Sequence, residues 1–295
     1  MEKIGGATNK KENAYGFDVH CHDFRTLRFG FPTENHARRS FFDALTQEAF
    51  PLSNGGLLFA FNNKETFADA DFDGWKVYQP ADEFARQGVK PDVWRAADIN
   101  ADYSLCETYP QQFFIPASIS DDTLKSAASF RTKSRLPMLV WVHPTHQVAL
   151  TRCSQPRVGF TGRNLDDEAY LKALRPAGAK LYIIDARPRA NAIANQMSGA
   201  GTESVSVYEN TELLYMNIDN IHVMRESLRS LRDHCFPFVA ETGWYAKVEA
   251  TKWLDHVRLV LTAAVRIVDL MDRAKYSCLV HCSDGTVLQQ QKAIL

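Results

Sequence analysis

The sequence predicts an α/β fold, and three features of its second half support this prediction. The compact apolar run KLYIID (180–185) is typical of a buried strand. A long helix is predicted over 246–274, because its apolar residues fall on one face: Leu254, Val257, Leu261, Ala264, Val268 and Met271. The strand YSCLV (276–280) follows at once, and strand, helix and strand in this order indicate a layered α/β domain.

The N-terminal part has a different character. Residues 1–15 are polar and rich in Gly, Lys and Asn, which predicts a disordered end. The segment 16–31 is typical of one or two strands. A helix is predicted over 33–50 from a threonine cap and the apolar residues Phe41, Phe42, Leu45 and Phe50. The turn-forming SNGG (53–56) follows that helix, so we expect the chain to change direction there.

The composition limits the classes of function. The 295 residues are 45% hydrophobic, which is enough for a sizeable core. A net charge of −1 provides no general basic field, so no nucleic-acid partner is expected. The sequence has no apolar stretch of about 18 residues and no apolar leader, so neither a membrane span nor a signal peptide is expected. The six scattered cysteines are interpreted as reduced thiols, which predicts a cytoplasmic protein.

The segment LVHCSDG (279–285) carries the clearest chemical signal. A strand that opens into Cys-Ser-Asp-Gly directs consecutive backbone N–H groups at an anion and favours a thiolate nucleophile. Phosphatases built on such a loop need Cys, five further residues and Arg, whose guanidinium grips two phosphate oxygens. Position 288 is Leu, and the next basic residue is Lys292. A cysteine after a strand is also often only a small buried hydrophobe.

The wider sequence resembles one family. HCSDG (281–285) is similar to the start of the active-site loop of the myotubularins. CHDFRTLRFGF (21–31) resembles the last part of the PH-GRAM domain of that family. Further segments resemble it in the family's order: GWKVYQPADEFARQGV (74–89), DYSLCETYP (102–110), RLPMLVWVHP (135–144), CSQPRVGFTGRNLDDEAYL (153–171), LYIIDARPRANAIAN (181–195), NIDNIHVMRESLRSLRD (217–233) and KWLDHVRLVLTAAVRI (252–267).

The resemblance implies a domain plan. After a disordered tail at 1–15, we expect a β-rich PH-GRAM remnant over 16–60. An α/β cysteine-phosphatase-like (myotubularin) domain is expected over 65–285, with the Cys loop at the C-terminal end of a central parallel strand. Residues 286–295 match nothing in the family pattern, so an unrelated tail and a C-terminally truncated domain are predicted.

The resemblance also implies an activity and a site. Myotubularins remove the D3 phosphate from phosphatidylinositol 3-phosphate and 3,5-bisphosphate at endosomal membranes. Cys282 is expected to be the nucleophile, with Asp284 as a second catalytic residue that reaches the inositol ring. The substrate-binding residues implied are Ser283, Asp284, Gly285, Asn195, Asn220 and Ile221. No metal or cofactor is expected; the expected partners are a phosphoinositide headgroup, a full-length myotubularin and a peripheral membrane contact.

Three departures from the family pattern affect the predicted activity. Thr286 replaces the loop tryptophan, Val287 replaces a second loop aspartate, and Leu288 replaces the arginine. Turnover is therefore predicted to be very weak or absent. Three hypotheses stay open: an active 3-phosphatase, a catalytically dead module that binds a phosphoinositide or a full-length myotubularin, and a truncated product without function of its own.

Other motifs give weaker signals. His20 with His22, and His143 with His146, could suggest zinc, but strand and loop histidines are the favoured interpretation. SGAGTE (198–203) lacks a dinucleotide fingerprint and is predicted to be a flexible loop beside the pocket. The basic residues of RESLRSLRD (225–233) predict a solvated helix face, with a phosphoinositide-facing patch as the alternative.

Overall fold

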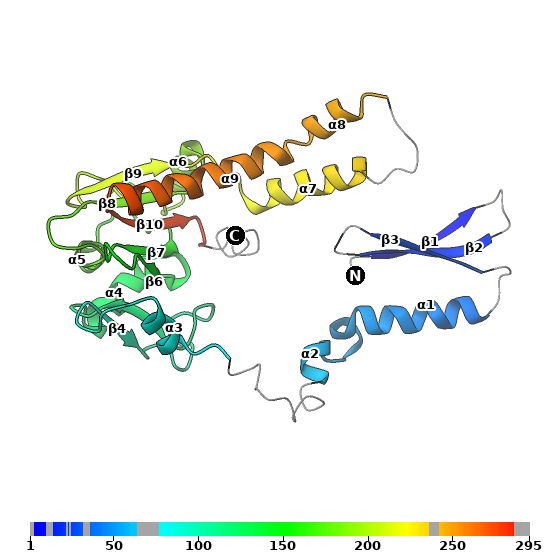
Figure 1. The fold of residues 1–295 in the computed structure, drawn as a ribbon, viewed down its shortest axis with the longest axis horizontal. Coiled ribbons are helices and arrows are strands. Elements are labelled where there is room, and N and C mark those ends of the chain that lie inside the picture. Colours follow the sequence, from blue (N-terminus) through cyan, green and yellow to red (C-terminus); the bar gives the residue numbers. More distant parts are fainter. Residues whose placement is uncertain are drawn as a thin grey trace. The chain divides into compact units, whose positions relative to one another are not determined.

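The chain forms two compact units, which divide after Val77. The computed structural model describes residues 3–9, 14–21, 23, 25–31, 36–63, 77–235 and 242–285. The units are Met1–Val77 and Tyr78–Leu295, and each is described by itself (Figure 1).

The first unit is a small antiparallel sheet with a helix packed on it. Its strands pair in the order β1 (Lys3–Asn9), β2 (Ala14–His20) and β3 (Thr26–Phe31). After them come α1 (His36–Ala49), a 3₁₀ turn (Pro51–Asn54) and the short α2 (Phe59–Asn62). The buried ring of Phe17 lies 5.4 Å from that of Phe29 and 5.5 Å from that of Phe42 in α1, measured between ring centroids. These aromatic contacts fix α1 against the sheet.

The N-terminal end differs from the prediction. Residues 3–9, which fall within the segment predicted to be disordered (1–15), form β1. Their register runs from Lys3 opposite His20 to Asn9 opposite Ala14. Because antiparallel pairing satisfies backbone N–H and C=O groups whatever the side chains are, a polar and Gly-rich segment can still form a strand. The strands predicted over 16–31 and the helix predicted over 33–50 are present as β2, β3 and α1.

The second unit is built around a five-stranded sheet, which confirms the α/β class. The strand order is β6 (Met138–Val142), β7 (Ala149–Ser154), β10 (Ser277–Cys282), β8 (Leu181–Asp185) and β9 (Thr211–Tyr215). β10 pairs in parallel with β7 and β8, β8 pairs in parallel with β9, and β6 is antiparallel to β7. The Cys loop therefore follows the C-terminal end of a central parallel strand.

Helices and a second small sheet complete this unit (Figure 1). The helices are α3 (Pro80–Arg86), α4 (Asp121–Ser129), α5 (Leu165–Ala173), α6 (Arg189–Met197), α7 (Ile221–Cys235), α8 (Trp244–Ala250) and α9 (Trp253–Val268). The small sheet pairs β4 (Trp94–Ala97) with β5 (Phe113–Pro116). A 3₁₀ turn (Thr132–Ser134) follows α4, and a π-helical turn (Asp269–Arg273) follows α9.

The central strands are buried on both faces, as the continuous apolar runs predicted. Alternate residues of β8 and β10 point to opposite sides of the sheet. Ile183 and Leu279 join a large core that includes α4 and α5. Ile184 and Val280 join a second core with residues of the π-helical turn. The sheet is thus fixed from two sides, and the loop after β10 starts from a rigid base.

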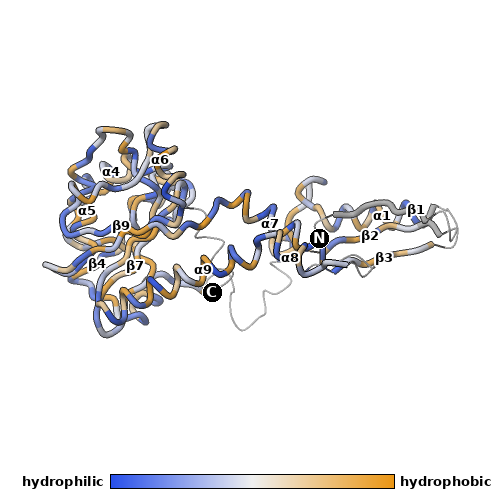
Figure 2. The backbone as a smooth tube through the Cα atoms, turned by 90° about the horizontal axis from the view of Figure 1, so that it is seen from above, coloured by the Kyte–Doolittle hydropathy of each residue, from blue (hydrophilic) through white to orange (hydrophobic). Residues whose placement is uncertain are grey.

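The long helix predicted over 246–274 is wrong in its bounds. Lys252 has a φ of 62°, which no α-helix accommodates, so α8 ends before it and α9 begins after it. The predicted apolar stripe is also largely not the buried face, although its last residue, Met271, is buried. Leu254, Leu261 and Val268 are 66%, 47% and 60% exposed, whereas Val260 and Ala263 are buried. Hydrophobic and hydrophilic residues alternate along α9 (Figure 2). Within the described ranges, no helix has both the length and the hydropathy that crossing a membrane would need.

Candidate functional site

Most of the residues singled out from the sequence line one cavity of about 410 Å³ at the C-terminal end of β10. The loop after β10 contributes Cys282, Ser283 and Asp284, and α6 contributes Asn195. The start of α7 contributes Asn220 and Ile221. Parallel strands end at the same edge of a sheet, and ligands of open α/β sheets bind at that edge. The fold therefore brings together residues that lie far apart in the sequence.

The Cys loop turns sharply at Gly285. Cys282 is only 2% exposed, and the Gly285 N–H donates to its Sγ over 3.1 Å. Gly285 has a φ of +72°, and a Cβ there would lie 2.8 Å from the Cys153 carbonyl oxygen. Only glycine fits this conformation and this approach. The turn thus directs a backbone dipole at the sulfur.

A buried arginine fixes the next residue of the loop. Ser283 Oγ accepts hydrogen bonds from Arg187 Nη1 (3.3 Å) and Asn195 Nδ2 (2.9 Å). Arg187 Nε and Nη2 also donate to the two carboxylate oxygens of Asp185 over 2.9 and 2.7 Å. Its remaining N–H groups donate to Gln155 Oε1 and to the Gly201 carbonyl. Because all five N–H groups have acceptors, Arg187 is a support for the loop and has no donor left for a phosphate oxygen.

Asp284 is held by two basic residues, one buried and one exposed. Arg135 Nη1 donates to its carbonyl oxygen, and Lys133 Nζ lies 3.3 Å from its Oδ2. The Lys133 and Asp284 side chains are 58% and 45% exposed, so this ion pair contributes at most about 1 kcal/mol. A ligand can therefore displace Lys133 from the carboxylate at little cost.

Asn220 caps the N-terminus of α7 beside the cavity. Its Oδ1 accepts the backbone N–H groups of His222 (2.9 Å) and Val223 (3.2 Å), which caps α7. The N-terminus of α7 lies at the cavity, where its partial positive charge favours an anion.

A chain of buried charges lies behind the loop. His281 Nε2 is 3.0 Å from Glu203 Oε2, and Arg131 Nη1 donates to the other Glu203 oxygen. Arg131 also donates to both oxygens of Asp167, over 2.7 and 2.6 Å, and Tyr208 Oη donates to Asp167 over 2.9 Å. Burial raises the pKa of Asp167, whereas the Arg131 guanidinium, which donates to both carboxylate oxygens, favours its ionised form. Removing Arg131 leaves Asp167 buried without an ionic partner, and removing Glu203 leaves His281 without one.

The electrostatics of this chain favour a charged His281. Burial alone would lower the pKa of His281, but the Glu203 and Asp185 carboxylates outweigh it and raise that pKa above its usual value. Burial likewise opposes ionisation of Glu203, yet His281 and Arg131 hold the pKa of Glu203 well below its usual range.

We expect stability to fall as pH rises through the raised pKa of His281. The folded state binds the proton more tightly than the unfolded state, so the contribution is complete below about pH 6.5 and is lost above the folded pKa. The free energy of unfolding from urea titrations should decline between pH 6 and 9 by at most about 1.4 kcal/mol per pH unit from this group. His281→Asn should show a smaller decline; an equal decline would contradict the assignment to His281.

Arg187, Gln155 and Glu203 were not predicted as site residues. Asp185 and Arg187 stand two positions apart at the end of a buried strand, and that pairing was the available signal. SGAGTE (198–203) was predicted to be a flexible loop, but Glu203 is 1% exposed and joined to the core by ion pairs. A short polar segment between glycines resembles a surface loop unless the buried partner of its carboxylate is known.

The histidine pairs have partners of other kinds. His20 Nδ1 lies 3.1 Å from Thr26 Oγ1, and His22 lies outside the described residues. His143 Nε2 lies 3.2 Å from Asp272 Oδ1, and the His146 ring stacks on His143 with 4.4 Å between centroids. His143 Nδ1 accepts the N–H groups of Thr145 and His146, so Nε2 carries the ring proton and donates to Asp272. Both ring nitrogens of His143 thus have hydrogen-bond partners without an ion.

Comparison with known proteins identifies the family. The sequence profile described as "Myotubularin-like phosphatase domain" matches residues 58–293, well over half of the chain. The chain belongs to the myotubularin-like phosphatase family. The matched segment continues past Gly285, so it includes most of the residues (286–295) that were predicted to be an unrelated tail.

The relatives have similar sequences over almost all of this chain. It is 49% identical to "Myotubularin" of Xenopus tropicalis over 97% of its own length and 48% of that protein. It is 48% identical to "Phosphatidylinositol-3,5-bisphosphate 3-phosphatase MTMR2" of Mus musculus over 97% of its length and 44% of that protein. The protein of the same name in Gallus gallus is 48% identical, with 50% of its length covered. The chain thus spans about half the length of these relatives.

Proposed function

We propose that the cavity at Cys282 recognises the phosphorylated headgroup of a phosphoinositide, and that this chain turns it over very weakly or not at all. The observation that carries the proposal is the position of Cys282 in the wall of the cavity, with a backbone N–H directed at its sulfur. The names of its relatives support a substrate phosphorylated at D3 of inositol, such as phosphatidylinositol 3-phosphate or 3,5-bisphosphate.

The chemistry available to such a site is cysteinyl-phosphate transfer. Cys282 Sγ would attack the D3 phosphorus, forming an S–P bond while the P–O bond to the inositol ring breaks and that oxygen takes a proton from water. Water would then hydrolyse the phosphocysteine. The loop amides and the N-terminus of α7 would hold the phosphate oxygens, and Asp284 would accept a hydrogen bond from a ring hydroxyl.

The low turnover follows from the missing arginine. Leu288 cannot donate to the transferring phosphate, and Val287 cannot protonate the leaving oxygen. Arg187 is close by, but its N–H groups are already bound to Asp185, Gln155, Ser283 and Gly201. Removing one preorganised donor typically costs 10²–10³ in rate, and a charged bidentate donor should cost at least about as much.

We expect no phosphate release above that of Cys282→Ser when the purified chain is given short-chain phosphatidylinositol 3-phosphate. The measurement is released phosphate over hours at saturating substrate. Release that disappears in Cys282→Ser would contradict the predicted inactivity and would mean that another group supplies the positive charge.

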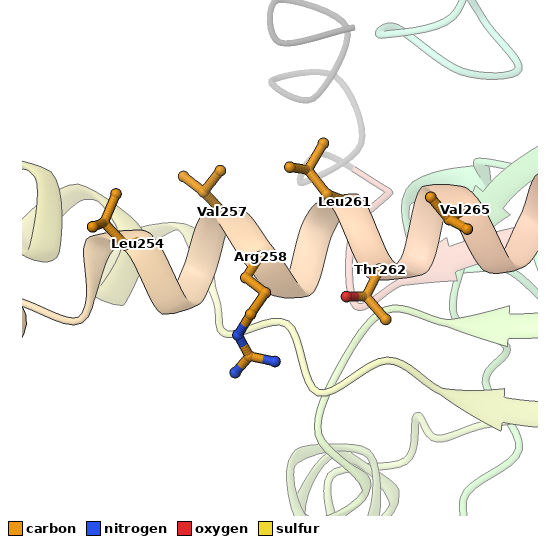
Figure 3. Close-up of a pocket in the computed structure, with 6 residues that line it drawn as sticks. All are labelled: Leu254, Val257, Arg258, Leu261, Thr262 and Val265. Atoms are coloured by element: carbon orange, nitrogen blue, oxygen red, sulfur yellow. The ribbon is translucent and has the colours of Figure 1, made fainter.

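A second candidate is a catalytically dead binding module with a protein partner, such as a full-length myotubularin. An apolar surface on α9 favours it: Leu254, Val257 and Leu261 project from the same side of the helix, with Arg258 turned away from them (Figure 3). Exposed apolar surface of this kind marks an interaction site or an aggregation liability.

A cooperative thermal melt of the isolated chain would support a folded module. The absence of a melting transition would favour a product without function of its own. Headgroup binding by a folded module would also permit a peripheral contact with endosomal membranes.

A further inference from the structure

Glu203 is the buried carboxylate that connects the SGAGTE segment to the Cys loop. Its side chain is fully buried, between Arg131 on one oxygen and His281 on the other. The same segment reaches Arg187 through the Gly201 carbonyl (2.9 Å). The SGAGTE segment therefore contacts His281 and Arg187, the two side chains that support the Cys loop from behind.

The charges in this region balance when Asp167 is ionised and His281 is charged. Asp167, Arg131 and Glu203 together carry a net charge of −1 when ionised, and a protonated His281 brings the buried chain to zero. A buried net charge is costly, so burial favours the neutral total.

Two other groups flank His281 on the neighbouring strands, and of these Asp185 also favours the charged ring. From β8 the register places Asp185 beside it, and the carboxylate of Asp185 is bound by Arg187. From β7 the register places Cys153 beside it, and burial raises the pKa of that thiol well above its usual value. Glu203 is thus the direct ionic partner of His281.

We propose that Glu203 is a positioning residue for the Cys282 loop, because its carboxylate keeps the His281 ring charged and fixed next to the nucleophile. His281 precedes Cys282 in β10, and its carbonyl accepts the N–H of Ala186, which lines the cavity (2.9 Å). A positive charge at the base of the loop strengthens binding of an anion in front of it. This inference rests on the proposed function, since it concerns anion binding in the same cavity.

The first test is the charge of His281 in the full chain, labelled with ¹⁵N at the histidine rings. At pH 7.5 we expect the ring-nitrogen signals of an imidazolium, assigned by their loss in His281→Asn. In Glu203→Gln the same signals should become those of a neutral ring. A neutral His281 in the wild-type chain would overturn the proposal, whatever the anion-binding result.

The second test measures anion binding through alkylation of Cys282 by iodoacetamide, with inorganic sulfate as the probe. Sulfate keeps its charge over pH 6–9, so only the protein titrates. At pH 7.5 the sulfate concentration that halves the alkylation rate should be severalfold higher in Glu203→Gln. The variant loses the charges of Glu203 and His281 together, and His281 directly precedes the loop that holds the anion. Sulfate protection of Cys282 should decline as pH rises in both proteins, and in Glu203→Gln this decline should begin at a lower pH than in wild type. Glu209→Gln, at an exposed carboxylate, is the matched control and should behave as wild type.

The outcomes separate the hypotheses. If sulfate protection in Glu203→Gln is weaker than in wild type by the same factor at every pH, or is not weaker at all, Glu203 has only a structural role and the proposal is overturned. If Glu203→Gln does not fold, the ring-nitrogen signals of the wild-type chain still decide. If sulfate protects neither protein, the proposed headgroup site fails while the state of His281 is decided separately.

Discussion

Replacing Arg131 by methionine should lower the free energy of unfolding of the second unit by about 3–5 kcal/mol, the usual cost of breaking a buried ion pair. The side chains of Arg131, Asp167 and Glu203 are all fully buried. Methionine fills much of the same space but donates no hydrogen bond. Asp167 would then be buried with only the Tyr208 hydroxyl as a partner, and it would have to bind a proton or open the core to water. Glu203 would keep His281 but lose the guanidinium on its other oxygen.

The effect should be visible as a shift of the urea midpoint of the Tyr78–Leu295 unit. Arg163→Met is the matched control, because Arg163 is 57% exposed and pairs with Glu168 at the surface over 2.9 Å. That control should change the free energy by at most about 1 kcal/mol. Similar losses in the two variants would contradict the view that the buried chain of charges is a main support of this unit.

The sequence predicted the strands β8 and β10 well and the charged core poorly. β8 and β10 are short, continuous apolar runs, and such runs are buried in parallel sheets wherever they occur. Lys252 gave no warning of the break between α8 and α9, because lysine is a good helix former and yet has a φ of 62° here. The exposed apolar residues of α9 have a related explanation. Periodicity in the sequence predicts that a helix has an apolar face, but it does not predict which part of the protein covers that face.

The candidate site divides in the same way. Cys282 and its loop carry a local pattern, a strand that ends in Cys-Ser-Asp-Gly. Asn195 and Asn220 have no local sequence signal, and only the family resemblance indicated them. They line one cavity because the parallel strands of the sheet end at the same edge. Arg187 has only a weak signal, its spacing from Asp185, and Glu203 has none, because its partners Arg131 and His281 are distant in the sequence.

Arg187→Lys should loosen the Cys loop even though it keeps the positive charge. Lysine presents three donors on one flexible atom, so it cannot bind Asp185 with two parallel hydrogen bonds and also reach Ser283, Gln155 and Gly201. We expect Cys282, now 2% exposed, to be alkylated by iodoacetamide at least about tenfold faster, as expected if the variant loses roughly 1.4 kcal/mol of support for the closed loop.

The comparison can be made within one sample, because Cys235 is exposed and distant in sequence from the loop. The ratio of Cys282 to Cys235 modification, followed by mass spectrometry, removes differences in reagent and pH. Arg189→Lys is the matched control: it is the same change two residues away, at an exposed position, and should leave the ratio as in wild type. An unchanged ratio in Arg187→Lys would mean that Asn195 alone holds Ser283. The position of the Cys loop would then depend on the side-chain amide of Asn195, and the hydrogen bonds of Arg187 would stabilise only the core behind the loop.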